Sequence, residues 1–411
     1  MSTQGVPIAK PAIVGPDLAL HSDPAGRRSL CAETLIARAL ENEGRTSFHN
    51  WSFIEPLHQL ISALNGEARL SSFGARAARF DVTRCLVNLL RLDAAEEREP
   101  DIAARPIERP IFITGLPRSG STFLHTLLAQ DRANAVPRCW QLIYPYPARS
   151  RMPFGDWRKA RVALQLGLYK RIAPAVADLH PMAADGPQEC SDITAHVFHS
   201  MRFDNTYHLP SYQAWISRHD HVHAYRFHKR FLRHLDRQQP GRRWFLKSPD
   251  HVFALDAVRA TYPDAVLVFL HRDPFPVLTS QLNLIEALRR SFSRHVDLEE
   301  IGRNVSEAIA DIANRLVANC ARRGVLHLSY HSVIAQPMDA IRRIYSHGGL
   351  LLTREGTERM TRWLAREKPR RAHSRRRDLA GFGLDAHELR ARFEPYVETF
   401  GMAPEQDRLA A

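Results

Sequence analysis

The sequence contains no long apolar run and few cysteines. Among its 411 residues, no stretch approaches the roughly 18 consecutive apolar residues of a membrane-spanning helix. The first 23 residues hold one lysine and three prolines but lack the apolar block of a secretory signal, so no signal is expected. The cysteines are dispersed, which favours free thiols in a reducing compartment: Cys31, Cys85, Cys139, Cys190 and Cys320. Together these features predict a cytoplasmic protein without a membrane span.

Acidic residues are fewer than basic ones. The 57 Lys and Arg exceed the 44 Asp and Glu, which gives a net charge of +13. Residues 359–377 contain nine Lys or Arg and one acid, Glu367, so this stretch carries +8 and the rest of the chain +5. Such a run can contact nucleic acid, a membrane or an anionic cofactor, or can be a solvated face.

Periodicity divides the chain into a helical part and an α/β part. Residues 29–92 carry apolar side chains at helical spacing, and residues 93–109, which are charged and contain prolines, are interpreted as a linker. We therefore expect a helical N-terminal extension over residues 1–104 and a catalytic domain over residues 105–411. From Pro110 onward, apolar strands at 111–113, 243–247, 265–270 and 325–330 alternate with helices. This alternation predicts an α/β fold with a phosphate-loop-like parallel sheet flanked by helices.

The most informative motif follows the first of these strands. Gly115 and Gly120 bracket four residues, and the hydroxyls of Ser121 and Thr122 begin a helix. A strand, a glycine loop and a helix N-terminus together form an anion-binding cradle. The lysine of an ordinary phosphate loop is replaced by Ser121, so a smaller anion than a triphosphate is expected, with Arg118 as an additional donor.

Polar residues also follow two later strands. Lys247 and Ser248 end the strand at 243–247, and His271, Arg272 and Asp273 follow the strand at 265–270. Ligands of parallel sheets bind at the carboxyl ends of the strands. We therefore expect these residues to meet the loop at one edge of the sheet.

Three motifs of the chain resemble those of a known family. They are Gly115–Thr122, the Trp-Phe-Leu-Lys-Ser-Pro at 244–249 and the His-Arg-Asp-Pro at 271–274 with Ser280. The family is that of sulfotransferases that use 3′-phosphoadenosine 5′-phosphosulfate (PAPS), in the bacterial branch related to tyrosylprotein sulfotransferases. The resemblance extends to about residue 400. It implies a sulfuryl transfer from PAPS to a hydroxyl or amine by in-line displacement, without a metal.

The resemblance also implies roles for individual residues. The cradle of the 5′-phosphosulfate consists of Arg118, Ser119, Gly120, Ser121 and Thr122. Arg272 and Ser280 clamp the 3′-phosphate. Lys247 contacts the bridging oxygen between phosphate and sulfuryl group, where a cation stabilises the charge that develops as the S–O bond breaks. Arg370 and Arg371 belong to a C-terminal loop that closes over the cofactor, although the glycine usual in that loop is replaced here.

Two residues are candidates for the general base. Tyrosylprotein sulfotransferases use a glutamate where this chain has Gln141, which cannot accept a proton at neutral pH. Glu189 and His180 lie in a stretch that resembles a family-specific segment, and we expect one of them to be the base, with Glu189 preferred. The structural alternative for Glu189 is a helix cap or an ion pair with an arginine. His125 is expected to pack in the core.

Two other functions compete with this interpretation. A phosphate-loop kinase or NTPase would need the missing loop lysine and an acid for magnesium. The interpretation as a nucleic-acid-binding protein rests on the charge of residues 359–377 alone, and this stretch contains few aromatic residues. A zinc site at the histidines of residues 219–228 is disfavoured because that segment is expected to be helical. The sequence is compatible with a small molecule, a lipid or a glycan as the acceptor. Aromatic residues between 148 and 215 are expected to line the acceptor site.

Overall fold

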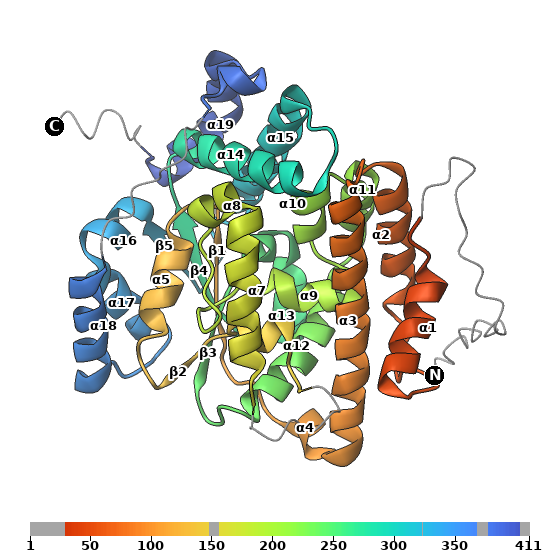
Figure 1. Ribbon diagram of the computed structural model, residues 1–411. Helices are drawn as coiled ribbons and strands as arrows, with labels where there is room; N and C mark the ends of the chain where they lie inside the picture. The colour runs from red at the N-terminus through yellow and green to blue at the C-terminus, as the bar shows by residue number, and fades with distance from the viewer. Residues whose placement is uncertain (1–28, 148–155, 323, 368–376, 403–411) are drawn as a thin grey trace, which may run out of the picture.

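A five-stranded parallel sheet forms the centre of the molecule (Figure 1). The computed structural model describes residues 29–147, 156–322, 324–367 and 377–402. The strand order is β2-β3-β1-β4-β5, and the strands are β1 (Ile111–Gly115), β2 (Asn134–Ala135), β3 (Arg243–Lys247), β4 (Val266–His271) and β5 (Val325–Ser329). The predicted α/β fold with a parallel sheet is therefore confirmed. In the described part of the chain, every helix is too short or too polar to cross a bilayer.

Helices surround the sheet. Before β1 lie α1 (Ala32–Glu43), α2 (Ile54–Gly66), α3 (Ser72–Arg98) and α4 (Asp101–Ala104). Between β1 and β3 lie α5 (Ser121–Leu128), α6 (Cys139–Ile143), α7 (Arg158–Ile172), α8 (Pro174–Leu179), α9 (Ser191–Thr194), η1 (Ala195–Val197), α10 (Arg202–Tyr207), α11 (Pro210–Arg218) and α12 (Val222–Asp236). After β3 lie η2 (Pro249–Ala254), α13 (Leu255–Thr261), α14 (Pro274–Phe292), α15 (Leu298–Ala318), α16 (Tyr330–Ala335), α17 (Pro337–His347), α18 (Arg354–Arg366), η3 (Ala380–Phe382) and α19 (Ala386–Phe400).

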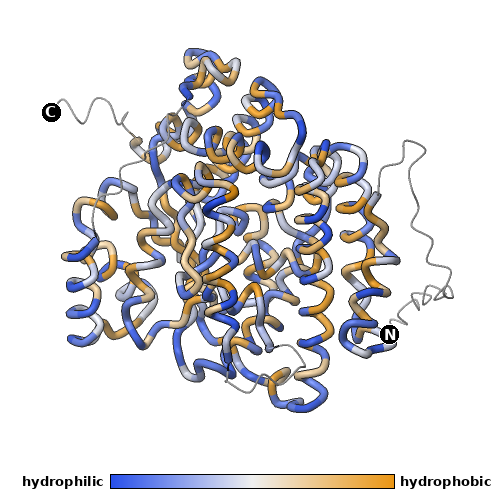
Figure 2. The backbone as a smooth tube through the Cα atoms, in the orientation of Figure 1, coloured by the Kyte–Doolittle hydropathy of each residue, from blue (hydrophilic) through white to orange (hydrophobic). Residues whose placement is uncertain are grey.

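The central strands are buried on both faces. Every residue of β1 and β4 is buried, as expected for apolar runs in a parallel sheet that helices cover on both sides. Successive side chains alternate between the faces. Phe112 and Leu267 belong to the core that the N-terminal helices share, whereas Ile113 and Val268 belong to a second core with α5, α17 and α18. In Figure 2, the hydrophobic residues (orange) of these elements lie in the interior of the molecule.

The linker predicted over residues 93–109 is wrong. Helix α3 continues to Arg98, and the short α4 follows Pro100. Ala94 and Ala95 favour the helix, and no breaker precedes Pro100. Asp93 is buried and pairs with Arg230 of α12 at 2.6 Å, so charge in this segment serves packing rather than exposure.

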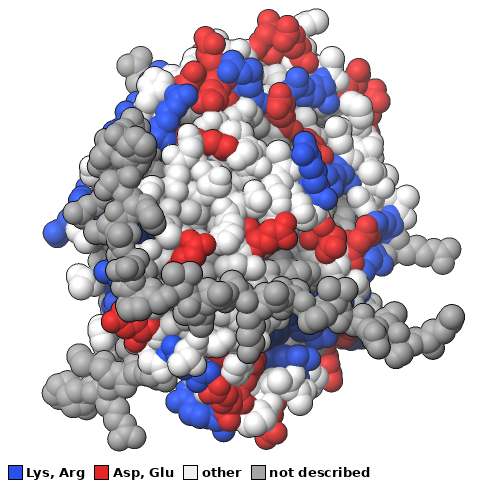
Figure 3. Space-filling view, turned by 90° about the vertical axis from the view of Figure 1, so that its right-hand side faces the viewer, with Lys and Arg blue, Asp and Glu red and all other residues white. Residues whose placement is uncertain are grey.

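The strand β2 was not predicted. It has only two residues, which is too short for a periodic signal, and it pairs with Arg243 and Trp244 of β3. The other four strands lie within one or two residues of their predicted positions. On the face in Figure 3, basic and acidic side chains are interspersed, and the described residues form no large patch of one sign there.

Candidate active site

The loop at residues 115–120 connects β1 to α5 in a tightly constrained backbone. A Cβ atom on Gly115 would lie 2.1 Å from the carbonyl oxygen of Leu270, so only glycine fits there. Gly120 adopts φ +79°, and Arg118 adopts φ +61°, a left-handed conformation that is unusual for arginine. Backbone strain of this kind persists at sites where the surrounding structure holds it in place. The hydroxyl of Ser119 is buried and has no hydrogen-bond partner among the described residues.

Arg118 and two other predicted donor-site residues lie together. The Nε of Arg118 donates to the hydroxyl of Ser280 at 3.0 Å, although 162 positions separate them. Another nitrogen of Arg118 donates to the carbonyl of Leu179 at 2.8 Å. Arg272 donates to the backbone carbonyl of Arg118 at 2.8 Å, and its guanidinium lies 3.9 Å from the centre of the Tyr330 ring.

Lys247 reaches the same loop from the end of β3. Its buried ammonium donates to the hydroxyl of Thr122 at 3.3 Å and to a carboxylate oxygen of Glu189 at 2.5 Å. The structure therefore brings the loop, Lys247 and Glu189 to one point, as the sequence predicts. Glu189 therefore forms an ion pair, but with Lys247 and not with the arginine that the structural alternative expects.

The backbone around Glu189 is fixed to the sheet. The N–H of Cys190 donates to the carbonyl of Lys247 at 2.9 Å. Helix α9 follows at once, and its Asp192 pairs with Arg202 at 3.3 Å. Arg202 in turn pairs with Asp81 of α3 at 2.7 Å. This network of charges holds Glu189 beside the end of β3.

The two candidate bases have lowered pKa values for different reasons. Burial would raise the pKa of Glu189, but the Lys247 ammonium and His180 outweigh burial and hold it below its usual value. Burial lowers the pKa of His180 to about 4, against the attraction of Glu189. At neutral pH, Glu189 is therefore a carboxylate and His180 a neutral imidazole, so each can accept a proton.

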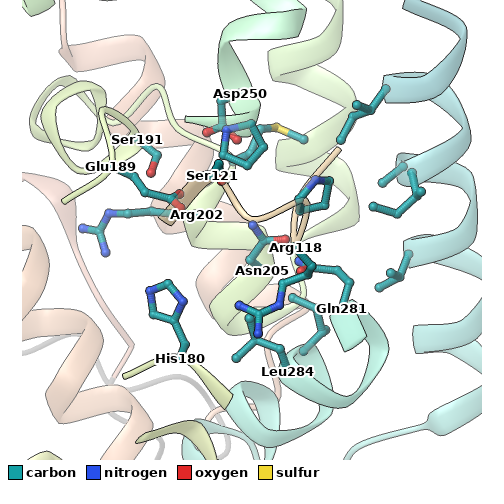
Figure 4. A pocket seen from close by; sticks show the side chains of 18 of the residues that line it. Arg118, Ser121, His180, Glu189, Ser191, Arg202, Asn205, Asp250, Gln281 and Leu284 are labelled. Carbon is teal, nitrogen blue, oxygen red and sulfur yellow. The ribbon is translucent and has the colours of Figure 1, made fainter. Parts of the chain in front are cut away.

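A cavity of about 480 Å³ joins these groups. In Figure 4, His180 and Asp250 lie on opposite sides of the cavity, and Glu189 lies between them. The polar part of the lining includes Arg118, Ser121, Thr122, His180, Glu189, Asp250 and Arg272. The size of the cavity is typical of small-molecule sites.

Asp250 is a site residue that sequence analysis missed. It lies at the start of η2, directly after the Ser248 and Pro249 that follow β3. The side chain lines the cavity, and its Oδ2 is buried without a hydrogen-bond partner among the described residues. Burial, together with repulsion from Glu189 and Asp192, raises the pKa of Asp250 to about 7. Its second oxygen accepts a backbone hydrogen bond from Met201.

One part of the cavity is a largely apolar arm between two helices, although the polar Gln281, Arg289 and Asn304 of the same helices also line the cavity. Leu284, Ile285 and Leu288 face it from α14, and Val305, Ala308, Ile309 and Ile312 face it from α15. Phe253 of η2 also lines the cavity. The expectation of an aromatic lining from residues 148–215 is wrong, because Phe198, Tyr207 and Tyr212 are buried in the main core. The apolar lining comes instead from helices later in the chain.

Several residues that the sequence singled out lie elsewhere. The ring of His271 forms hydrogen bonds with His327 at 2.9 Å and with Tyr396 of α19 at 3.2 Å. His271 therefore anchors α19 and does not face the loop. Buried His125 bonds the carbonyl of Phe245, which supports its expected packing role. Arg370 and Arg371 lie outside the described residues.

No group of potential metal ligands among the described residues includes the histidines at 219–228. His49, Asp93 and Glu96 are close enough to hold an ion. However, the Arg230 guanidinium already pairs with Asp93 and Glu96 at 2.6 and 2.8 Å.

The fold and the site together define a phosphate-loop-type α/β protein with arginine, lysine and serine side chains gathered at the edge of its sheet. The model of the sulfotransferase family matches residues 110–354, and the chain belongs to this family. This membership disfavours the kinase and nucleic-acid-binding alternatives.

Solved structures agree with this assignment. The chain is similar to sulfotransferase STF1 of Mycobacterium tuberculosis, with 31% identity, a TM-score of 0.77 and coverage of 89% of this chain and 98% of that one. It is also similar to sulfotransferase STF9 of Mycobacterium avium, with 28% identity, a TM-score of 0.79 and coverage of 91% and 97%.

A curated relative is the omega-hydroxy-beta-dihydromenaquinone-9 sulfotransferase Stf3 of Mycobacterium bovis. It is 24% identical over 251 residues, which are 59% of this chain and 63% of the relative. The match therefore spans less than two thirds of that protein.

Proposed function

We propose that this protein transfers a sulfuryl group from PAPS to an acceptor hydroxyl or amine. The observation that carries the proposal is the position of the buried Lys247 ammonium, 3.3 Å from Thr122 of the loop and 2.5 Å from Glu189. A cation at this point can stabilise charge on a leaving phosphate, and an adjacent carboxylate can take a proton. Membership of the sulfotransferase family supports the same reaction.

The donor would occupy the loop side of the cavity. The loop residues 118–122 would hold the 5′-phosphosulfate, and the unpartnered hydroxyl of Ser119 offers one donor for it. Arg272 and Ser280 would hold the 3′-phosphate, because both already contact Arg118 next to the loop. We assign Arg370 and Arg371 to the same cofactor. The five free cysteines suit a reducing, cytoplasmic compartment.

The proposed step exchanges one S–O bond for another. The acceptor oxygen attacks sulfur and forms the new S–O bond, while its proton passes to Glu189. The bond from sulfur to the bridging oxygen breaks, and its electron pair leaves on the 5′-phosphate of adenosine 3′,5′-bisphosphate. Lys247 and Arg118 stabilise that charge, so the step needs no metal and a chelator should leave the rate unchanged. His180 is the alternative base.

Arg272→Ala should weaken the binding of adenosine 3′,5′-bisphosphate by about 10- to 100-fold, the scale of a charged hydrogen bond. Isothermal titration calorimetry measures this directly. Adenosine 5′-monophosphate, which lacks the 3′-phosphate, should bind the variant and the parent equally. An equal loss for both nucleotides would mean that Arg272 only supports the loop. Tighter binding of ATP than of the bisphosphate would contradict the proposed donor.

We further propose that the acceptor has an apolar body, because the arm between α14 and α15 is lined by aliphatic side chains. The relative Stf3 is named for a menaquinone-derived acceptor, which agrees with this class.

Among 4-alkylphenols, kcat/KM should rise about threefold to fourfold for each methylene that enters the arm. Ala308→Phe should abolish the rise while phenol turnover persists, and Ala308→Ser should change little. Rates that do not depend on chain length would refute the apolar acceptor without affecting the donor assignment.

A further inference from the structure

Helix α7 carries an unusual concentration of exposed apolar side chains. Seven large hydrophobic residues are exposed in the described part of the chain, and four of them belong to α7 and the residue before it. Leu164 is 77% exposed, Leu168 58%, Ile172 47% and Trp157 42%. Leu164, Leu168 and Ile172 are four residues apart, so they form one stripe along the helix.

The opposite face of α7 is also apolar. Val162 is fully buried against α6, and the ring of Tyr169 stacks on Phe292 of α14. A helix that is apolar on both faces is ordinarily buried, yet α7 stands at the front of the molecule in Figure 1 with no element drawn before it. An exposed apolar stripe of this kind marks an interaction surface.

The charge on this segment is of one sign. Residues 157–177 contain no Asp or Glu and five basic residues. Arg158 pairs with Asp156 and Lys159 with Asp185, both beyond the ends of the segment. Lys170 and Arg171 are exposed and form no ion pair with any described residue; Arg171 lies beside the apolar stripe, seven residues after Leu164, whereas Lys170 lies on the side of the helix away from it. Apolar and aromatic side chains flanked by unpaired cations are typical of helices that lie in the interface of an anionic bilayer.

We propose that α7 docks this protein on an anionic lipid bilayer, with Trp157, Leu164, Leu168 and Ile172 inserted among the lipids, Arg171 against their headgroups and Lys170 adding to the positive charge of the helix. A second copy of the chain is a poorer occupant, because pairing two such faces would bring their unpaired cations together. The docked helix would lie next to the cavity: α8 follows α7 directly, its Leu179 carbonyl holds Arg118, and His180 lines the cavity. The proposal concerns attachment and does not depend on the proposed sulfuryl transfer.

Co-sedimentation of the full chain with lipid vesicles tests this proposal. We expect binding to vesicles of phosphatidylcholine mixed with phosphatidylglycerol, and weaker binding to phosphatidylcholine alone or at high salt. The double variant Leu164→Gln, Leu168→Gln should lower binding roughly tenfold or more, because two exposed leucines no longer insert. Leu351→Gln is the matched control, since Leu351 is 82% exposed and lies outside α7. The variant Lys170→Gln, Arg171→Gln should lose the preference for the anionic lipid.

Three results would overturn the proposal. These are no binding to the anionic vesicles, binding that the leucine pair does not change, and a dimer in sedimentation velocity that the leucine pair dissociates. The third result would assign the stripe to a contact between copies. Calorimetry with adenosine 3′,5′-bisphosphate verifies that each variant is folded, and it can succeed or fail separately from vesicle binding.

Discussion

Lys247→Ala should lower kcat by about 10²- to 10³-fold, the scale of removing one preorganised charge partner from a developing oxyanion. The side chain is buried at the end of β3, and its ammonium lies 3.3 Å from the hydroxyl of Thr122 at the start of α5. Adenosine 3′,5′-bisphosphate lacks the sulfuryl group, and its former bridging oxygen is one of several oxygens that share the charge of the 5′-phosphate. Its affinity should therefore change far less than the rate. Steady-state kinetics and calorimetry on the same preparation separate the two effects.

The variant also leaves Glu189 without its cation. Loss of one member of a buried ion pair costs about 3–5 kcal/mol, and the partial exposure of Glu189 reduces that cost. The double variant Lys247→Ala, Glu189→Gln removes the unpaired charge and should recover stability without recovering the rate. Near-normal turnover in Lys247→Ala would refute the assigned role. If Lys247→Ala is poorly folded and the double variant restores the fold, part of the loss of rate in Lys247→Ala came from unfolding.

The residues that meet at the edge of the sheet could be predicted from the sequence, because parallel strands end on the same side of a sheet. Gly115, Lys247 and Arg272 each follow an apolar run, and this placement alone indicates that they meet. The contact of Arg118 with Ser280 is different. Helical spacing indicates how far Ser280 lies from Arg272, but it does not indicate which loop side chain Ser280 contacts. Arg118, which makes this contact, is 162 positions away from Ser280.

The apolar arm illustrates what periodicity cannot provide. The spacing of the apolar positions 301, 305, 309 and 312 is typical of one buried stripe of a long helix, and all four are buried in α15. Burial against protein and burial beside a cavity give the same pattern, because both exclude polar side chains. Only the packing of α14 against α15 determines that Val305 and Ile309 border open space.

The extent of α3 shows a related limit. Charged residues at 93–99 suggested a linker, but the partner that buries Asp93 is Arg230, 137 positions away. Pairing over such distances turns a charged segment into a packed one, and no local pattern reports it. Asp250 was missed for the same reason, since its pKa depends on Glu189 and Asp192 from another part of the chain.

Glu189→Gln should lower kcat by about 10²- to 10⁴-fold, because an amide cannot take the acceptor proton. The substitution keeps the size of the side chain, and its amide oxygen can still accept from Lys247, so folding and nucleotide affinity should persist. His180→Asn is the matched comparison. If His180→Asn abolishes turnover while Glu189→Gln retains it, the imidazole is the base and Glu189 only positions Lys247.

The pH dependence of kcat/KM distinguishes the carboxyl groups. The pKa of Glu189 lies below its ordinary value, so its base form persists as the pH falls, and its acid limb should appear below the ordinary pKa of a glutamate. Asp250, with a pKa raised to about 7, is protonated below that pH and charged above it. A limb near pH 7 should therefore vanish in Asp250→Asn but persist in His180→Asn. Loss of that limb in His180→Asn instead would assign the neutral titration to the imidazole and contradict its lowered pKa, because a group with a pKa of about 4 cannot titrate at pH 7.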